Sequence, residues 1–278
     1  MGIVCVCLVG RVDAQTIDVD NLPVTERQEV YKTIGDVELK MHIFEANDRD
    51  TETAAPAVVF FFGGGWTGGS PKQFFPHCRY FASRGMVAMA AEYRIKSKHG
   101  TTPFECTADG KSAVRWIRAN AKKLGIDPKQ VVAGGGSAGG HVAACTGTIQ
   151  RHDEEKEDTS VSSTPDAMML FNPVIDTTSK GYGAAKVKGR ETEISPAHHV
   201  RKGIPPTIIF HGTADTTVPY ENVERFDKLM REAGNTCRLV PFDGKGHGFF
   251  NHGRDADSFD KTIRAADEFL TELGILTP

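Results

Sequence analysis

Hydrophobic residues alternate strictly with polar ones over residues 37–43. Alternation is typical of strands with one face in the core and one in water, so we predict strands at Val24–Thr33 and Val37–Glu45. The turn at 34–36 would join them into a hairpin at a sheet edge. Later apolar runs are continuous, as in strands that are covered on both faces. These runs are Ala57–Phe62, Met86–Ala91, the stretch from Val131, Ala167–Phe171, Pro206–Phe210 and Arg238–Phe242.

Segments with helical spacing of apolar residues separate the continuous runs. The predicted helices cover Pro71–Arg84, Pro103–Leu124, a stretch that begins near Ala138, Tyr220–Glu232 and Arg254–Leu273. A regular exchange of strand and helix after an initial hairpin predicts the α/β class. We expect a mostly parallel central sheet of about eight strands with helices on both faces.

Two long segments fit neither pattern. Gln150–Ser163 is a highly charged loop whose acidic residues lack the spacing of a calcium loop, so we expect a solvated surface with His152 exposed. Residues 177–202 have few periodic signals. We expect them to form a small irregular cap over the site, in which His198 and His199 have structural roles.

Length and charge limit the classes of function. The 278 residues suffice for one α/β domain, which we expect over residues 15–278. A net charge of −3 and a pI near 6.4 give no basic surface for nucleic acid or anionic membranes. No apolar run approaches the roughly 20 residues of a membrane span. We therefore expect a small-molecule or carbohydrate partner. The cysteines form no C-x-x-C pair and no Cys/His cluster of a metal site, and we expect neither a metal nor a cofactor.

The N-terminus carries a short apolar run, Ile3–Val9, followed by small residues before Gln15. Residues 1–14 resemble a truncated export signal, although no Lys or Arg precedes the apolar run. This pattern favours a secreted or periplasmic protein. The alternative is a cytoplasmic protein whose N-terminus forms an edge strand or has no fixed structure.

One stretch carries the candidate nucleophile. Gly135-Gly136-Ser137-Ala138-Gly139 fits G-x-S-x-G, the strand-to-helix turn that exposes a nucleophilic serine above a sheet. Glycines on either side of Ser137 avoid collisions in so sharp a turn. The helix that begins near Ala138 would direct its free N–H groups toward a developing oxyanion. The alternative is a glycine-rich turn that only allows close packing.

Asp215 and His247 are the candidate partners of Ser137. All three residues follow predicted strands, as does the glycine loop Gly63–Trp66, and parallel strands bring their carboxyl ends to one edge of a sheet. A serine hydroxyl needs an imidazole to take its proton, and the imidazole needs a carboxylate to fix its tautomer. The chain order Ser137, Asp215, His247 is the order of one hydrolase topology only.

Other residues compete for these roles. Asp176 also follows a strand end and is the alternative acid. His252 lies close to His247 but beyond two phenylalanines, where the next helix begins. We expect His211 to be a structural histidine, and Tyr93 to pack and hydrogen-bond beside the nucleophile turn.

The segments GGGW, EYR, GGGSAGGH, HGTADTTVP and GHGF together resemble the α/β-hydrolase superfamily, and within it the bacterial carboxylesterases near the acetyl esterase, acetyl xylan esterase and feruloyl esterase groups. The resemblance implies the α/β-hydrolase fold, with oxyanion donors at the backbone N–H groups of Gly64, Gly65 and Ala138. Phe62 stands where the HGGG pattern has histidine, and Gly136 where lipase-like relatives carry Asp. HGTAD is closer to the dienelactone hydrolase and prolyl oligopeptidase branches.

These observations predict a serine ester hydrolase that acts on short-chain, acetyl-type carboxylic esters through a Ser-His-Asp acyl-enzyme mechanism, with acetylated carbohydrates among its candidate substrates. We expect Trp66, beside the glycine loop, to wall a small acyl pocket; simple packing is the alternative. A serine peptidase or lactone hydrolase would use the same triad and is an alternative function. So is a hydrolase-fold binding protein without activity.

Overall fold

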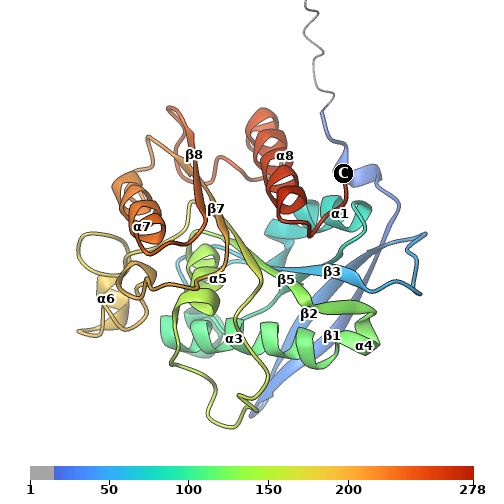
Figure 1. Ribbon diagram of the computed structural model, residues 1–278. Helices are drawn as coiled ribbons and strands as arrows, with labels where there is room; N and C mark the ends of the chain where they lie inside the picture. The colour runs from blue at the N-terminus through green and yellow to red at the C-terminus, as the bar shows by residue number, and fades with distance from the viewer. Residues whose placement is uncertain (1–15) are drawn as a thin grey trace, which may run out of the picture.

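An eight-stranded sheet forms the centre of the computed structural model, which describes residues 16–278 (Figure 1). The predicted signal segment at 1–14 lies outside the described residues. All eight predicted strands are present, although the fifth begins earlier than expected, at Ile126. The strands are β1 Val24–Ile34, β2 Val37–Ala46, β3 Ala55–Phe61, β4 Val87–Ala91, β5 Ile126–Gly136, β6 Ala167–Phe171, β7 Thr207–Gly212 and β8 Cys237–Phe242.

The sheet is mostly parallel, as predicted. Its strand order is β1-β2-β4-β3-β5-β6-β7-β8. β1 pairs antiparallel with β2, and β2 pairs antiparallel with β4, whereas every pair from β4 to β8 is parallel. The hairpin therefore lies at one edge. The loops that follow β3, β5, β7 and β8 all leave from the carboxyl ends of parallel strands, where such sheets form their sites.

Helices cover both faces of the sheet. Phe60 of β3 packs with Phe81 and Phe269, which lie on α1 and α8, whereas Phe61 belongs to the core on the opposite face with Val142 of α5. Figure 1 shows α1 and α8 on one side of the sheet and α3 and α5 on the other. The helices are α1 Phe75–Ser83, α2 Lys96–His99, α3 Pro103–Ala119, α4 Ala121–Leu124, α5 Ala138–Thr148, α6 Ala184–Val187, α7 Tyr220–Glu232 and α8 Ala256–Glu272, with 3₁₀ turns at Val19–Asn21, Pro71–Phe74 and Pro196–His198.

Two predicted helices are divided in the structure. The helix expected from Pro71 begins as a 3₁₀ turn, and α1 starts only at Phe75. Pro76 has no N–H to donate to the preceding turn, so an α-helix cannot run through it unbroken. The helix expected over Pro103–Leu124 ends at Ala119, because Asn120 leaves the helical conformation with a ψ of 15° before the short α4.

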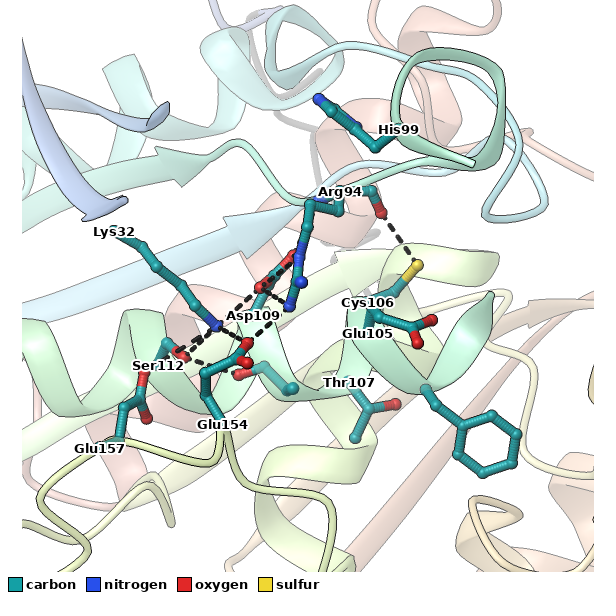
Figure 2. A network of polar contacts seen from close by, with 12 residues as sticks. Lys32, Arg94, His99, Glu105, Cys106, Thr107, Asp109, Ser112, Glu154 and Glu157 are labelled. Carbon is teal, nitrogen blue, oxygen red and sulfur yellow. Dashed lines mark hydrogen bonds and ion pairs between the residues drawn. The ribbon is translucent and has the colours of Figure 1, made fainter. Parts of the chain in front are cut away.

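The charged loop at 150–163 is largely exposed, as expected, but one of its residues joins a cluster of buried charges that the sequence did not predict. Its Glu154 lies 2.7 Å from Lys32 Nζ and 2.7 Å from Arg94 Nη2, and both cations also bind the carboxylate of Asp109 on α3 (Figure 2). Asp109 is completely buried and the two cations nearly so. We call Lys32, Arg94, Asp109 and Glu154 the Asp109 cluster. Loop composition could not reveal it, because the partners of Glu154 lie far away in the sequence.

The histidines of the irregular segments make local contacts. His152, expected to be exposed, is partly buried with its ring centre 5.1 Å from that of Phe104. In the 177–202 segment His198 hydrogen-bonds with the Ser195 hydroxyl, and His199 with a backbone carbonyl. Among residues 16–278 no helix combines the length and apolarity that crossing a membrane requires.

Candidate active site

β5 turns directly into α5 at Ser137. The serine has a φ of +55°, a backbone region that side-chain-bearing residues rarely adopt, and it stands at the apex of the turn. A Cβ on Gly139 would lie 2.0 Å from the carbonyl oxygen of Phe61, and one on Gly135 would lie 2.4 Å from that of Gly139. Only glycine fits at both positions, which is the mechanical role that the motif predicts.

The side chains of Ser137, His247 and Asp215 form one hydrogen-bonded series. His247 Nε2 lies 2.9 Å from Ser137 Oγ, and His247 Nδ1 lies 2.7 Å from Asp215 Oδ2. Because a carboxylate can only accept, we assign the ring proton to Nδ1, which donates to Asp215. Nε2 is then free to accept the serine proton. The loops after β5, β7 and β8 thus bring together three residues that are far apart in the sequence.

The carboxylate of Asp215 is buried and surrounded by donors. Oδ1 accepts the backbone N–H groups of Thr217 and Val218 at 2.8 and 2.9 Å, and His211 Nε2 lies 3.3 Å from Oδ2. Burial alone raises the pKa of the Asp215 carboxyl, but hydrogen bonds from His211, His247 and the Val218 amide outweigh it and hold the pKa well below its usual range. Asp215 is therefore ionised at neutral pH and can stabilise a charged imidazole.

The alternative acid and base make other contacts. Asp176 forms an ion pair with Arg225 at 2.5 Å and accepts the backbone N–H of Thr178. The ring of His252 packs edge-on against Phe259. His211, expected to be structural, hydrogen-bonds with the Val218 carbonyl at 3.0 Å and so supports the turn that carries Asp215.

The glycine loop after β3 lies beside Ser137. A Cβ on Gly63 would be 3.3 Å from the Cβ of Ser137, and Gly64 and Gly65 have φ values of +125° and +60°. Gly64, Gly65 and Ser137 line the same cleft. Ala138 is the first residue of α5, so its N–H has no acceptor within the helix. The role of these amides as oxyanion donors stays a prediction.

Trp66 does not line the cleft, which corrects its expected role as a wall of the acyl pocket. With a φ of +58°, it places its ring behind the loop, where the side chain is 1 % exposed and packs edge-on against His141. Tyr182 and Phe250 line the cleft instead. Tyr93 behaves as expected: its hydroxyl donates to the Phe62 carbonyl at 2.6 Å, beneath the glycine loop.

A cleft of about 480 Å³ opens at Ser137 and includes polar residues that sequence reasoning missed. Asn172 Oδ1 accepts the N–H of Gly248, and Gln73 Oε1 accepts the N–H of Gly63. Asn172 directly follows β6 and has a φ of +34°, which Asn tolerates better than most residues. The signal in the sequence was its place in an Asn-Pro pair at the end of a predicted strand. Gln73 lies within a predicted helix and gave none.

Two family models match the chain. One, described as BD-FAE, matches residues 41–183, and the dienelactone hydrolase family model matches residues 168–273. The two matches together include all the residues of the hydrogen-bonded series at Ser137.

Solved structures of esterase 2 from Thermogutta terrifontis are similar to this chain over most of its length. The structure phosphoramylated by tabun is 50 % identical, with a TM-score of 0.88, and the match covers 91 % of this chain and 96 % of that one. The propionate-bound and butyrate-bound structures have TM-scores of 0.87 at 49 % and 48 % identity, with the same coverage.

Curated relatives are more distant and longer. Esterase LipC of Mycobacterium tuberculosis is 27 % identical over 235 residues, which are 75 % of this chain and 56 % of LipC. Endo-1,4-beta-xylanase B of Butyrivibrio fibrisolvens is 31 % identical over 208 residues, which are 69 % of this chain and 30 % of that protein. The chain thus spans little more than half of LipC and less than a third of the xylanase.

Proposed function

Because the chain belongs to the α/β-hydrolase serine carboxylesterases, with the BD-FAE model matching residues 41–183 and esterase 2 sharing 50 % identity, we propose that it hydrolyses carboxylic esters. One observation carries the proposal. The ring of His247 hydrogen-bonds with Ser137 Oγ at 2.9 Å on one side and with the Asp215 carboxylate at 2.7 Å on the other. This is the arrangement that makes a serine hydroxyl nucleophilic.

The proposed reaction is a two-step acyl transfer to water. Ser137 Oγ attacks the ester carbonyl carbon while its proton passes to His247 Nε2, and the resulting oxyanion accepts hydrogen bonds from the amides of Gly64, Gly65 and Ala138. The bond to the alcohol oxygen then breaks, and His247 returns the proton to that oxygen. Water attacks the acyl-enzyme by the same steps, which releases the acid and restores the serine.

Short acyl groups are the proposed substrates, acetyl esters included. Support comes from esterase 2, whose structures have propionate and butyrate bound, and from the cleft, whose volume of about 480 Å³ is modest. We include acetylated carbohydrates because the sequence resembles acetyl xylan esterases and is similar to a protein named as a xylanase.

A substrate panel tests the proposal. Wild type and Ser137→Ala would be assayed on nitrophenyl esters from acetyl to long acyl chains and on acetylated sugars, and a fluorophosphonate would be used to label the serine. We expect labelling at Ser137, fastest turnover with two- to four-carbon acyl chains, and loss of both in Ser137→Ala. Absence of labelling in folded protein would contradict the mechanism, and faster turnover of long chains would contradict the substrate class.

A lactone hydrolase is the second candidate function, because the dienelactone hydrolase family model matches residues 168–273. That segment contains Asp215 and His247, so the same acyl-enzyme would form from a cyclic ester. A simple lactone added to the panel separates the two functions. Lactone turnover above that of the acetyl esters would favour this candidate.

A further inference from the structure

A chain of side-chain amides crosses the cleft from the glycine loop to the loop that carries His247. The N–H of Gly63 donates to Gln73 Oε1 at 2.6 Å, Gln73 Nε2 donates to Asn251 Oδ1 at 2.8 Å, and Asn251 Nδ2 donates to the Gly248 carbonyl at 2.8 Å. All four residues line the cleft. We call this series the Gln73 bridge.

The direction of the bridge is fixed by chemistry at both ends. A backbone N–H can only donate, so the oxygen of Gln73 must face Gly63, and its nitrogen is left for Asn251. A backbone carbonyl can only accept, so the nitrogen of Asn251 must face Gly248. Each side chain therefore has one orientation that satisfies both neighbours. A change at either amide breaks the series.

The two loops that the bridge joins carry opposite parts of the proposed machinery. Gly64 and Gly65, which follow Gly63, have no side chains to hold them and adopt positive φ angles. On the other side, Gly248 follows His247 directly and also has a positive φ, of +78°. Glycine-containing segments can adopt many backbone conformations, so hydrogen bonds from other parts of the chain are needed to fix their positions. A misplacement of about 1 Å in such a site costs about 100-fold in rate.

We propose that Gln73 is a positioning residue that sets the distance between the oxyanion donors on the glycine loop and the imidazole of His247, with Asn251 as its partner. This inference rests on the proposed function. Gln73 acts through Gly63 and Asn251 rather than on the reacting atoms. The donors that Gln73 positions act on the oxyanion, which exists only in the transition state and the intermediates. Loss of the Gln73 side chain should therefore lower kcat and leave KM nearly unchanged.

The test compares kcat and KM for p-nitrophenyl acetate in Gln73→Leu, Asn251→Leu and the double variant. We expect each single variant to lower kcat about 10- to 100-fold with KM within about threefold of wild type. Because either substitution breaks the same bridge, we expect the kcat of the double variant to be little lower than that of the less active single variant. Gln28→Leu, at an exposed position on β1, is the matched control and retains the wild-type kcat.

Gln73→Glu tests the same idea without removing the side chain. In this variant the ionised carboxylate still accepts the Gly63 N–H but cannot donate to Asn251, whereas the protonated carboxyl group can do both. We therefore expect its kcat, relative to wild type at the same pH, to rise as the pH falls toward about 5, nearer the ordinary pKa of a glutamate. A purely structural role would give no such dependence.

The outcomes separate this inference from the function on which it rests. Wild-type kcat in Gln73→Leu, or additive losses in the double variant, with an active and Ser137-dependent wild type, would overturn the bridge alone. A wild type without esterase activity, or with activity that survives Ser137→Ala, would overturn both proposals. If Gln73→Leu does not fold, the pH dependence of Gln73→Glu decides.

Discussion

Asp215 and Asp176 are both aspartates that follow strands of the parallel sheet, yet only Asp215 reaches an imidazole. We expect Asp215→Asn to lower kcat by about 10³- to 10⁴-fold, because the amide can no longer hold His247 in the required tautomer or balance its charge. Asp176→Asn is the control, since its carboxylate pairs with Arg225, and should keep kcat near that of wild type. Steady-state ester hydrolysis measures both. Near-normal activity of Asp215→Asn would remove it from the mechanism.

Single residues are predictable where a local rule fixes them. Ser137 can be found because a sharp strand-to-helix turn demands glycines around it, and His247 because a glycine-flanked loop follows the last strand. Gln73 and Asn251 obey no local rule, since they lie 178 residues apart in the sequence. The prediction for Trp66 is wrong for a related reason: the sequence shows its position beside the glycine loop but not the positive φ that turns it inward.

His77 and His141 are completely buried histidines whose pKa values make stability depend on pH. Burial lowers the pKa of His77 from its ordinary 6.5 to about 3 and that of His141 to about 4. Between about pH 6.5 and these values the unfolded chain binds protons that the folded chain does not. The free energy of unfolding therefore falls as the pH falls, by about 1.4 kcal/mol per pH unit for each histidine.

His77→Leu removes one of these two titrations. Urea unfolding at pH 7 and pH 4.5 should show that the variant loses about 2.5 kcal/mol less stability between the two pH values than wild type does. Comparing the two pH values within each protein cancels the effect of the substitution on packing. A loss equal to that of wild type would contradict a neutral His77 in the folded core.

At the scale of elements, the junction of β5 and α5 requires glycine by contact with β3. A Cβ on Gly139 would overlap the carbonyl oxygens of Phe61 and Phe62, at 2.0 and 2.3 Å. We expect Gly139→Ala to lower the free energy of unfolding by about 3 kcal/mol or more and to abolish ester hydrolysis, because β3 and the glycine loop must move away from Ser137.

Gly68→Ala is the control for this substitution. A Cβ there meets no atom within 4 Å, and the residue lies in the same loop region as the cleft glycines. Thermal unfolding and kcat of the two variants should differ sharply, with Gly68→Ala close to wild type. A stable and active Gly139→Ala would mean that the junction can relax.

The types and order of the elements are predictable, whereas the ends of helices and the state of the loops are less so. Alternation over residues 37–43 and continuous apolar runs reflect which faces each strand buries, and that information is local. The break between α3 and α4 depends on the non-helical backbone conformation of Asn120, which its residue type does not require. The ion pairs of Glu154 in the 150–163 loop depend on charges that come together only when the sheet has formed.

At the scale of the whole molecule, the Asp109 cluster connects parts of the chain that the sheet topology leaves separate. Lys32 comes from the edge strand β1, Arg94 from the segment after β4, Asp109 from α3 and Glu154 from the charged loop. Asp153 of the loop also forms ion pairs with basic residues of α3. Within the cluster, Asp109 is the α3 carboxylate that both cations share. Removal of this carboxylate would leave two nearly buried cations without their main partner.

Asp109→Ala should therefore lower the free energy of unfolding by about 3–5 kcal/mol, the usual cost of breaking a buried ion pair from one side. Equilibrium urea unfolding measures the change, and it should persist in about 1 M salt because buried charges are poorly screened. Glu232→Ala, which removes an exposed partner of Lys228, is the control and should change stability by less than about 1 kcal/mol. None of the cluster residues lines the cleft at Ser137, so folded Asp109→Ala should keep its kcat at low temperature. A stability change as small as that of the control would show that the edge strand and the loop are held by their other contacts instead.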